Sequence, residues 1–188
     1  QPIGLLVLGN RHTHYTATPE LIDVVSIFSK QVSLALENAL LLRKNKALAI
    51  RDELTGLYNE PYIRQRLDEE IKRAIAYQRP CALAMFTVDS LGAFRSRRGE
   101  PEAEGVMKKI ARVIQESVTE IDRVGRFNNN WFVVLLPERN KREALEIANS
   151  IRQRVEFAFA SSKDAGDRLT VSGSVAENPL DGVTAEDL

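Results

Sequence analysis

The sequence has few cysteines, no excess of charge of either sign and no long apolar run, and each absence excludes a class of protein. Its 188 residues include one cysteine, Cys81, which excludes an intrachain disulfide and a cysteine-based zinc site. Basic and acidic residues both number 26, so the balanced charge gives no sign of a surface for nucleic acid or acidic membranes. No uninterrupted apolar run approaches the roughly 20 residues that span a bilayer, and no signal peptide is present. We therefore expect a cytoplasmic protein with no membrane span and no nucleic-acid partner.

The first 17 residues predict an apolar strand over 3–9 and a polar loop that holds His12 and His14. No third ligand stands near the two histidines, so a solvated loop is favoured over a metal site. The chain opens inside this strand and closes, at 183–188, on what looks like the start of a helix. We expect it to be a fragment of a longer protein.

A long helix is predicted over residues 18–50, with Thr18 as its N-cap. Its apolar residues recur in alternating steps of four and three, which is the seam of a coiled coil. A single helix packed on its own domain is the alternative. We favour a parallel homodimer, because the helix is too long to be covered by the small piece before it. The seam consists of Leu21, Val25, Phe28, Val32, Ala35, Ala39 and Leu42.

Residues 51–188 predict one α+β domain. Asn59 caps a helix to about residue 77, which presents Ile63, Leu67, Ile71 and Ile75 on one face. The elements that follow are a strand over 82–89, a helix from 101, a hairpin of strands 121–127 and 131–136, a helix over 141–159 and a strand over 168–175. This order is the βαββαβ arrangement of a ferredoxin-like α/β sandwich. Cys81 opens an apolar run, so we expect a buried structural thiol.

Right-handed crossovers bring the C-terminal end of the first strand beside the hairpin tip. An acid on that strand and one or two at the tip would there hold a pair of Mg²⁺ ions over a nucleoside triphosphate. The tip has no carboxylate: it reads Asn128-Asn129-Asn130-Trp131-Phe132. Asparagine tolerates positive φ, so the turn is expected to form without the ligands that Mg²⁺ prefers.

Two segments resemble known motifs. Residues 52–59 (Asp-Glu-Leu-Thr-Gly-Leu-Tyr-Asn) resemble the D-x-L-T-G-L-x-N entry motif of the GGDEF family, the diguanylate cyclases, and 126–132 align with its signature R-[YF]-G-G-[DE]-E-F. The resemblance implies the palm-type core of nucleotidyl cyclases. Residues 28–39 are similar to the exit helix of a GAF domain. The implied domains are the end of a GAF-like sensor (1–17), a signalling helix (18–50) and a degenerate GGDEF domain without its last helix (51–188).

The resemblance also locates departures from the family pattern. Thr87 stands at the metal-binding Asp of the first strand, Gly92 at a phosphate-binding Lys, and Asn130 at the metal-binding acid of the signature. The family's inhibitory product site, R-x-x-D, aligns with Thr119 and Asp122, so its arginine is missing. The positions that could still contact a nucleotide are Asp89, Arg95, Glu104 and Arg126.

These departures predict a non-catalytic GGDEF module of a bacterial GAF-linked protein in cyclic di-GMP-type signalling. It would need no cofactor or metal and would act by dimerisation or on a partner or output domain. The alternative is a receptor that binds GTP or cyclic di-GMP without turnover. An active cyclase is disfavoured, because two-metal chemistry needs its carboxylates.

Overall fold

The computed structural model describes residues 18–48, 50–128, 130–161, 164 and 167–188. The expected strand over 3–9, both histidines and Asn129 lie outside these residues, as do the side chains of 42–48, Leu42 among them. The chain forms two compact units, residues 1–49 and 50–188, and each is described by itself.

The described part of the first unit is helix α1 (Pro19–Leu48). Thr18 caps it as predicted, because its Oγ1 accepts a hydrogen bond from the Leu21 backbone N–H at 3.3 Å. Leu21, Phe28 and Val32 of the predicted seam are 39%, 56% and 39% exposed in the single chain. The expectation of no candidate membrane span needs correction: Pro19–Leu41 is long and apolar enough to cross a membrane by length and composition. Charged residues interrupt this segment, so it contains no long uninterrupted apolar run. Its mean hydropathy is nevertheless high enough for a candidate membrane span.

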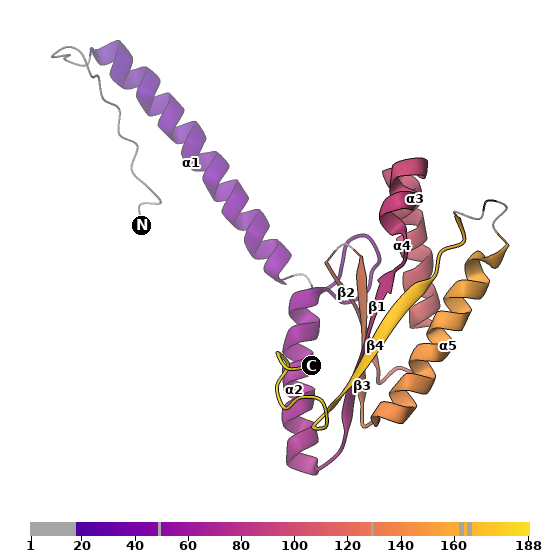
Figure 1. Cartoon of the computed structure of the whole chain (residues 1–188). Coiled ribbons are helices and arrows are strands. Elements are labelled where there is room, and N and C mark those ends of the chain that lie inside the picture. The colour runs from indigo at the N-terminus through magenta and orange to yellow at the C-terminus, as the bar shows by residue number, and fades with distance from the viewer. Residues whose placement is uncertain (1–17, 49, 129, 162–163, 165–166) are drawn as a thin grey trace. The chain divides into compact units, whose positions relative to one another are not determined.

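The second unit is a four-stranded antiparallel sheet between helices, as the sequence predicted (Figure 1). The strands are β1 (Cys81–Val88), β2 (Arg123–Phe127), β3 (Trp131–Pro137) and β4 (Val171–Asn178), in the order β2-β3-β1-β4. Helix α2 (Glu60–Tyr77) packs on one face, and α4 (Glu100–Gln115) and α5 (Lys141–Ala160) cover the other. A short helix α3 (Leu91–Arg98) joins β1 to α4.

Each face of the sheet has its own apolar core. Alternate residues of β1, such as Ala84 and Phe86, join the larger core beneath α4 and α5, while Leu83 and Met85 face α2. Side chains cap the starts of α2 and α5, and the sequence predicted the first of these caps. The Asn59 side chain accepts from the Tyr62 N–H, and Asn140 forms a capping box with Glu143.

Helix α2 lies close to the sheet because Gly125 has no side chain. A Cβ added to Gly125 would lie 2.3 Å from Ile63 Cγ1 and 3.1 Å from the Tyr58 carbonyl oxygen. Ile63 is fully buried at this contact. Glycine is therefore needed here for close approach between a helix and a strand.

The structure corrects several expected details. Ile75 is 57% exposed and Ala74 is buried in its place, because successive steps of four drift around a helix of 3.6 residues per turn. Strand β2 begins at Arg123 rather than 121, because a turn closed between Thr119 and Asp122 precedes it. Helix α3 was not predicted; its two buried residues, Leu91 and Phe94, make too short a pattern to detect.

Candidate functional site

The hairpin tip meets the C-terminal end of β1, as predicted. Thr87 pairs with Trp131 across the two strands, and the Val88 backbone N–H donates to the Asn130 carbonyl at 3.4 Å. Asn128 has φ +50°, so asparagine provides the left-handed conformation that this turn requires. The hairpin tip thus lies at the edge of the sheet where a two-metal site would hold its Mg²⁺ ions.

The side chains at the tip are neutral. Asn130 Oδ1 is buried and accepts no hydrogen bond from the part of the chain that the structure describes. Trp131 is 40% exposed and lines a groove of about 580 Å³ on the α2 face, together with Phe127 and Met85. Within the described ranges, no three His, Cys, Asp or Glu side chains lie close enough to hold a metal ion.

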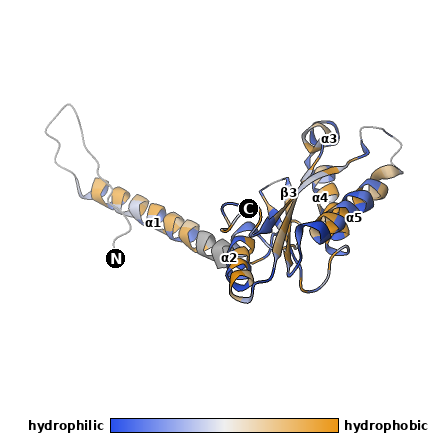
Figure 2. Ribbon diagram, turned by 60° about the horizontal axis from the view of Figure 1, so that its bottom comes forward, coloured by the Kyte–Doolittle hydropathy of each residue, from blue (hydrophilic) through white to orange (hydrophobic). Residues whose placement is uncertain are grey.

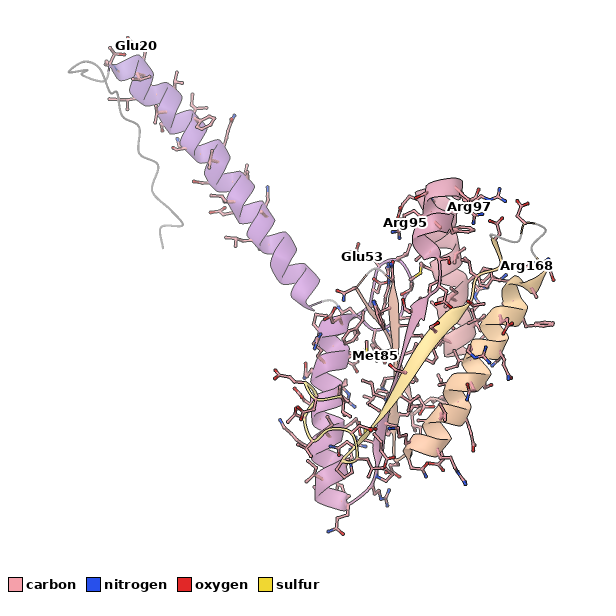
Figure 3. The ribbon with its side chains drawn as sticks, viewed as in Figure 1. Glu20, Glu53, Met85, Arg95, Arg97 and Arg168 are labelled. Atoms are coloured by element: carbon pink, nitrogen blue, oxygen red, sulfur yellow. The ribbon has the colours of Figure 1, made fainter. Side chains whose placement is uncertain are left out.

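The candidate nucleotide-contacting residues Asp89, Arg95 and Glu104 lie in separate segments, and the first two bond to other side chains. The Asp89 carboxylate accepts a hydrogen bond from Thr170 Oγ1 at 2.6 Å, which ties the end of β1 to the residues before β4. Arg95 projects from α3 and its Nε lies 2.9 Å from Glu100 Oε2 (Figure 3). Glu104 is exposed on α4. The sequence placed these side chains near one site but did not identify Thr170 and Glu100 as their partners.

The guanidinium of Arg126 binds a carboxylate of the entry segment. Its Nη1 lies 3.1 Å from Asp52 Oδ1 and 3.2 Å from Oδ2, and both side chains are largely buried. Thr55 also donates to Asp52 from its N–H and its hydroxyl, at 2.9 and 2.6 Å. Burial raises the pKa of Asp52, but the hydrogen bonds from Thr55 and Arg126 outweigh it and hold the pKa below its usual value. Arg126 is thereby oriented toward Asp52.

Backbone bonds reinforce this link. The Tyr58 N–H donates to the Val124 carbonyl at 3.1 Å, and the Arg126 N–H donates to the Tyr58 carbonyl at 2.8 Å. The segment that enters the second unit is therefore fastened to β2, the strand that leads directly to the hairpin tip. Asp52 and Arg126 both lie within recognisable sequence motifs, but the sequence does not show that their side chains meet.

Thr119 and Asp122, the predicted remnant of an inhibitory site, line a second hollow. Thr119 donates to Asp122 Oδ2 from its N–H and its hydroxyl, at 2.8 and 2.7 Å, so these two residues form one turn. Asp122 is 6% exposed, and its Oδ1 makes no hydrogen bond with the described residues. The hollow is about 230 Å³, and Arg51, Tyr58 and Arg123 also line it.

Comparison with known proteins decides the family. The model described as "Diguanylate cyclase, GGDEF domain" matches residues 49–188. The chain belongs to the GGDEF family. The match coincides with the second compact unit, so α1 lies outside the GGDEF domain.

The GGDEF domain resembles curated and solved members of the family. It is 30% identical over 144 residues to the response regulator PleD of Caulobacter vibrioides, covering 75% of this chain and 32% of that protein. It is 28% identical over 141 residues to the bifunctional diguanylate cyclase/cyclic di-GMP phosphodiesterase MucR of Pseudomonas aeruginosa, covering 75% and 20%. The chain thus spans a third or less of the length of these relatives.

A solved complex of the diguanylate cyclase SiaD with its activator SiaC, from Pseudomonas aeruginosa, matches with 28% identity and a TM-score of 0.64, covering 85% of this chain and 60% of that one. A sensory box/GGDEF family protein from Caulobacter crescentus matches with 25% identity and a TM-score of 0.66, covering 74% and 90%. These matches agree with the predicted cyclase-type fold.

Proposed function

We propose that this GGDEF domain is non-catalytic and transmits a signal in a cyclic di-GMP pathway. The observation that carries the proposal is the neutral hairpin tip: Asn130 stands at the family's metal-binding acid, and Thr87 stands at the metal-binding Asp of β1. Mg²⁺ requires oxygen ligands with negative charge to hold a triphosphate. An amide and a hydroxyl supply no such charge.

The retained fold supports a role in signalling rather than simple loss of function. Asn128 keeps the turn, and the link between Asp52 and Arg126 keeps the entry segment on β2. A module with these features would receive its signal from a GAF-like sensor through α1 and act as a homodimer in the cytoplasm. Its output would be a protein partner or a further domain.

Incubation with Mg²⁺ and GTP tests the first part of the proposal. We expect no cyclic di-GMP by chromatography, while a GGDEF cyclase that has its carboxylates, assayed in parallel, forms product. Formation of cyclic di-GMP at a rate abolished by mutating Thr87 or Asn130 would overturn the proposal and support an active cyclase.

A nucleotide receptor is the second candidate, and the hollow beside Asp122 favours it. Asp122 Oδ1 is a buried acceptor without a partner in the described chain, and buried acceptors are normally satisfied. The Arg51 guanidinium lies over the Tyr58 ring at 3.9 Å, which places a planar cation on the wall of the hollow. A base with N–H donors and a phosphate would suit these two groups.

Calorimetry separates the two candidates. Saturable binding of cyclic di-GMP or GTP at micromolar concentration, lost in Asp122→Asn and Arg51→Ala but kept in the exposed control Glu116→Gln, would establish the receptor. If neither nucleotide binds, the receptor is refuted and the signalling module without a nucleotide ligand is supported.

A further inference from the structure

Glu70 is a carboxylate on the buried face of α2. The other buried residues of this helix are Ile63, Leu67, Ile71 and Ala74, and Glu70 is only 6% exposed. Figure 2 shows hydrophilic and hydrophobic turns along α2, as expected of a helix with one face in the core. A buried charge is costly unless it is paired and hydrogen-bonded, so the position of Glu70 needs an explanation.

The contacts of Glu70 satisfy its carboxylate only in part. Its Oε1 lies 3.1 Å from Nη2 of Arg73 and 3.8 Å from Nη2 of Arg66, which makes two ion pairs within the helix. Neither oxygen accepts a hydrogen bond from the residues that the structure describes. Buried polar groups are normally hydrogen-bonded, so Glu70 can still accept from a further donor.

Glu70 lines a hollow of about 230 Å³ at the end of α2, where the chain turns into β1. We call it the Glu70 hollow. Cys81 at this end of β1 pairs with Pro137, whereas Thr87 at the other end pairs with Trp131, so the hollow and the hairpin tip lie at opposite ends of the sheet (Figure 1). It shares no lining residue with the hollow beside Asp122. Its lining consists of Glu70, Arg73, Ala74, Tyr77, Arg79, Pro80, Cys81 and Glu138.

Charges of both signs line the Glu70 hollow. Arg73 and Arg79 supply two guanidinium groups, and Glu138 supplies a second carboxylate. Arg79 Nη1 lies 2.6 Å from Glu138 Oε2, and these side chains are 59% and 51% exposed. An exposed pair of this kind contributes roughly 0–1 kcal/mol, and a guanidinium has five N–H donors. A carboxylate of a ligand can therefore join or replace Glu138 on Arg79 at little cost.

A ligand with a single charge does not suit this lining. A cation would be attracted by Glu70 but repelled by the two guanidinium groups, and an anion would meet the reverse. A zwitterion satisfies both: its ammonium group donates to Glu70 and its carboxylate accepts from Arg79. Ala74 and Pro80 offer apolar surface to a side chain. The volume is below the roughly 300–1,000 Å³ of sites for drug-sized molecules, so the ligand is small.

We propose that the Glu70 hollow binds an α-amino acid with an apolar side chain, with its ammonium group on Glu70 and its carboxylate on Arg79. The ligand would connect α2, the turn into β1 and the residue that follows β3. The proposal goes beyond the proposed function and does not depend on it, because neither the hairpin tip nor the hollow beside Asp122 takes part.

Calorimetry on the complete chain tests the proposal, with L-leucine, L-valine and L-phenylalanine as probes. At least one should bind saturably and raise the melting temperature. For leucine, 4-methylpentanoate lacks the ammonium group and 3-methylbutylamine lacks the carboxylate. Each should bind at least about tenfold more weakly than leucine, because it loses a hydrogen bond to a charged group. No binding by any of the three amino acids, or equal binding by either half-ligand, would overturn the proposal.

Substitutions assign the two charged groups of the ligand. Glu70→Gln should weaken binding of the amino acid about tenfold and remove the preference for leucine over 4-methylpentanoate. Arg79→Gln should remove the preference over 3-methylbutylamine. Asp68→Asn, at an exposed position of the same helix, is the matched control and should bind as the wild type does.

Circular dichroism checks that the variants fold. Arg79 is exposed at the rim, so Arg79→Gln keeps the proposal testable even if Glu70→Gln unfolds. Binding that is unchanged in Arg79→Gln, or weakened equally in Asp68→Asn, would place the amino acid elsewhere on the chain and refute the site.

Discussion

Arg126 and Asp52 lie 74 positions apart in the sequence and 3.1 Å apart in the structure, between Nη1 and Oδ1. The contact joins the entry segment to β2, and so to the hairpin tip. Because Asp52 also accepts two hydrogen bonds from Thr55, one carboxylate organises the whole entry turn. We expect this link to set both the stability of the domain and the order of the tip.

Asp52→Asn should lower the free energy of unfolding by about 1–3 kcal/mol, the usual cost of losing hydrogen bonds to a charged group. Urea denaturation at pH 7 measures it. Glu53→Gln is the matched control, because Glu53 is exposed (Figure 3) and should change stability by less than about 0.5 kcal/mol. Equal effects of the two substitutions would show that the link contributes nothing specific.

The same carboxylate predicts a pH dependence. The pKa of Asp52 is lower in the folded chain than its usual 3.8, so its stabilising effect is complete above about pH 4–5 and is lost as the pH falls through the folded-state value. The difference in stability between the wild type and Asp52→Asn should therefore shrink between pH 5 and pH 2, as followed by urea denaturation at each pH. A difference that stays constant over this range would contradict the prediction.

Gly125→Ala should destabilise the domain by about 1–3 kcal/mol, because the added Cβ would overlap Ile63. Gly105→Ala is the control: nothing lies within 4 Å of its Cβ position on α4, and alanine should stabilise that helix by about 0.5–1 kcal/mol. Thermal unfolding of both variants checks the signs. A Gly125→Ala variant that is as stable as the wild type, or more stable, would refute the close approach of α2.

Asn128→Ala should cost about 1–2 kcal/mol, since its φ of +50° is unfavourable for a residue with a Cβ and no local hydrogen bond to offer. Asn128→Gly should be close to neutral. Chemical denaturation compares them. If the alanine variant were as stable as the glycine variant, the turn would have a different conformation.

Cys81 should resist a thiol reagent at pH 8 in the folded protein. It is 2% exposed, and burial, with a smaller effect of Glu70, raises its pKa to about 12. Reaction should become complete in denaturant, with Cys81→Ala as the blank. Rapid labelling of the native protein would contradict the predicted structural thiol.

The sequence by itself determined the order of the four strands and the longer helices and the caps at Thr18 and Asn59, because these depend on local periodicity and on single residues. It also determined that the hairpin tip is neutral, because the sequence of residues 128–132 contains no carboxylate. Whether the domain is inactive, receives its signal from a GAF-like sensor or dimerises through α1 stays a prediction.

Only the tertiary structure decided the partners of the site residues. Arg126 binds Asp52, Arg95 pairs with Glu100, and Asp89 bonds to Thr170. Each contact depends on how a side chain emerges from one element toward another, and local patterns contain no such information. The same holds for Gly125, whose necessity follows from the distance to Ile63 rather than from any motif.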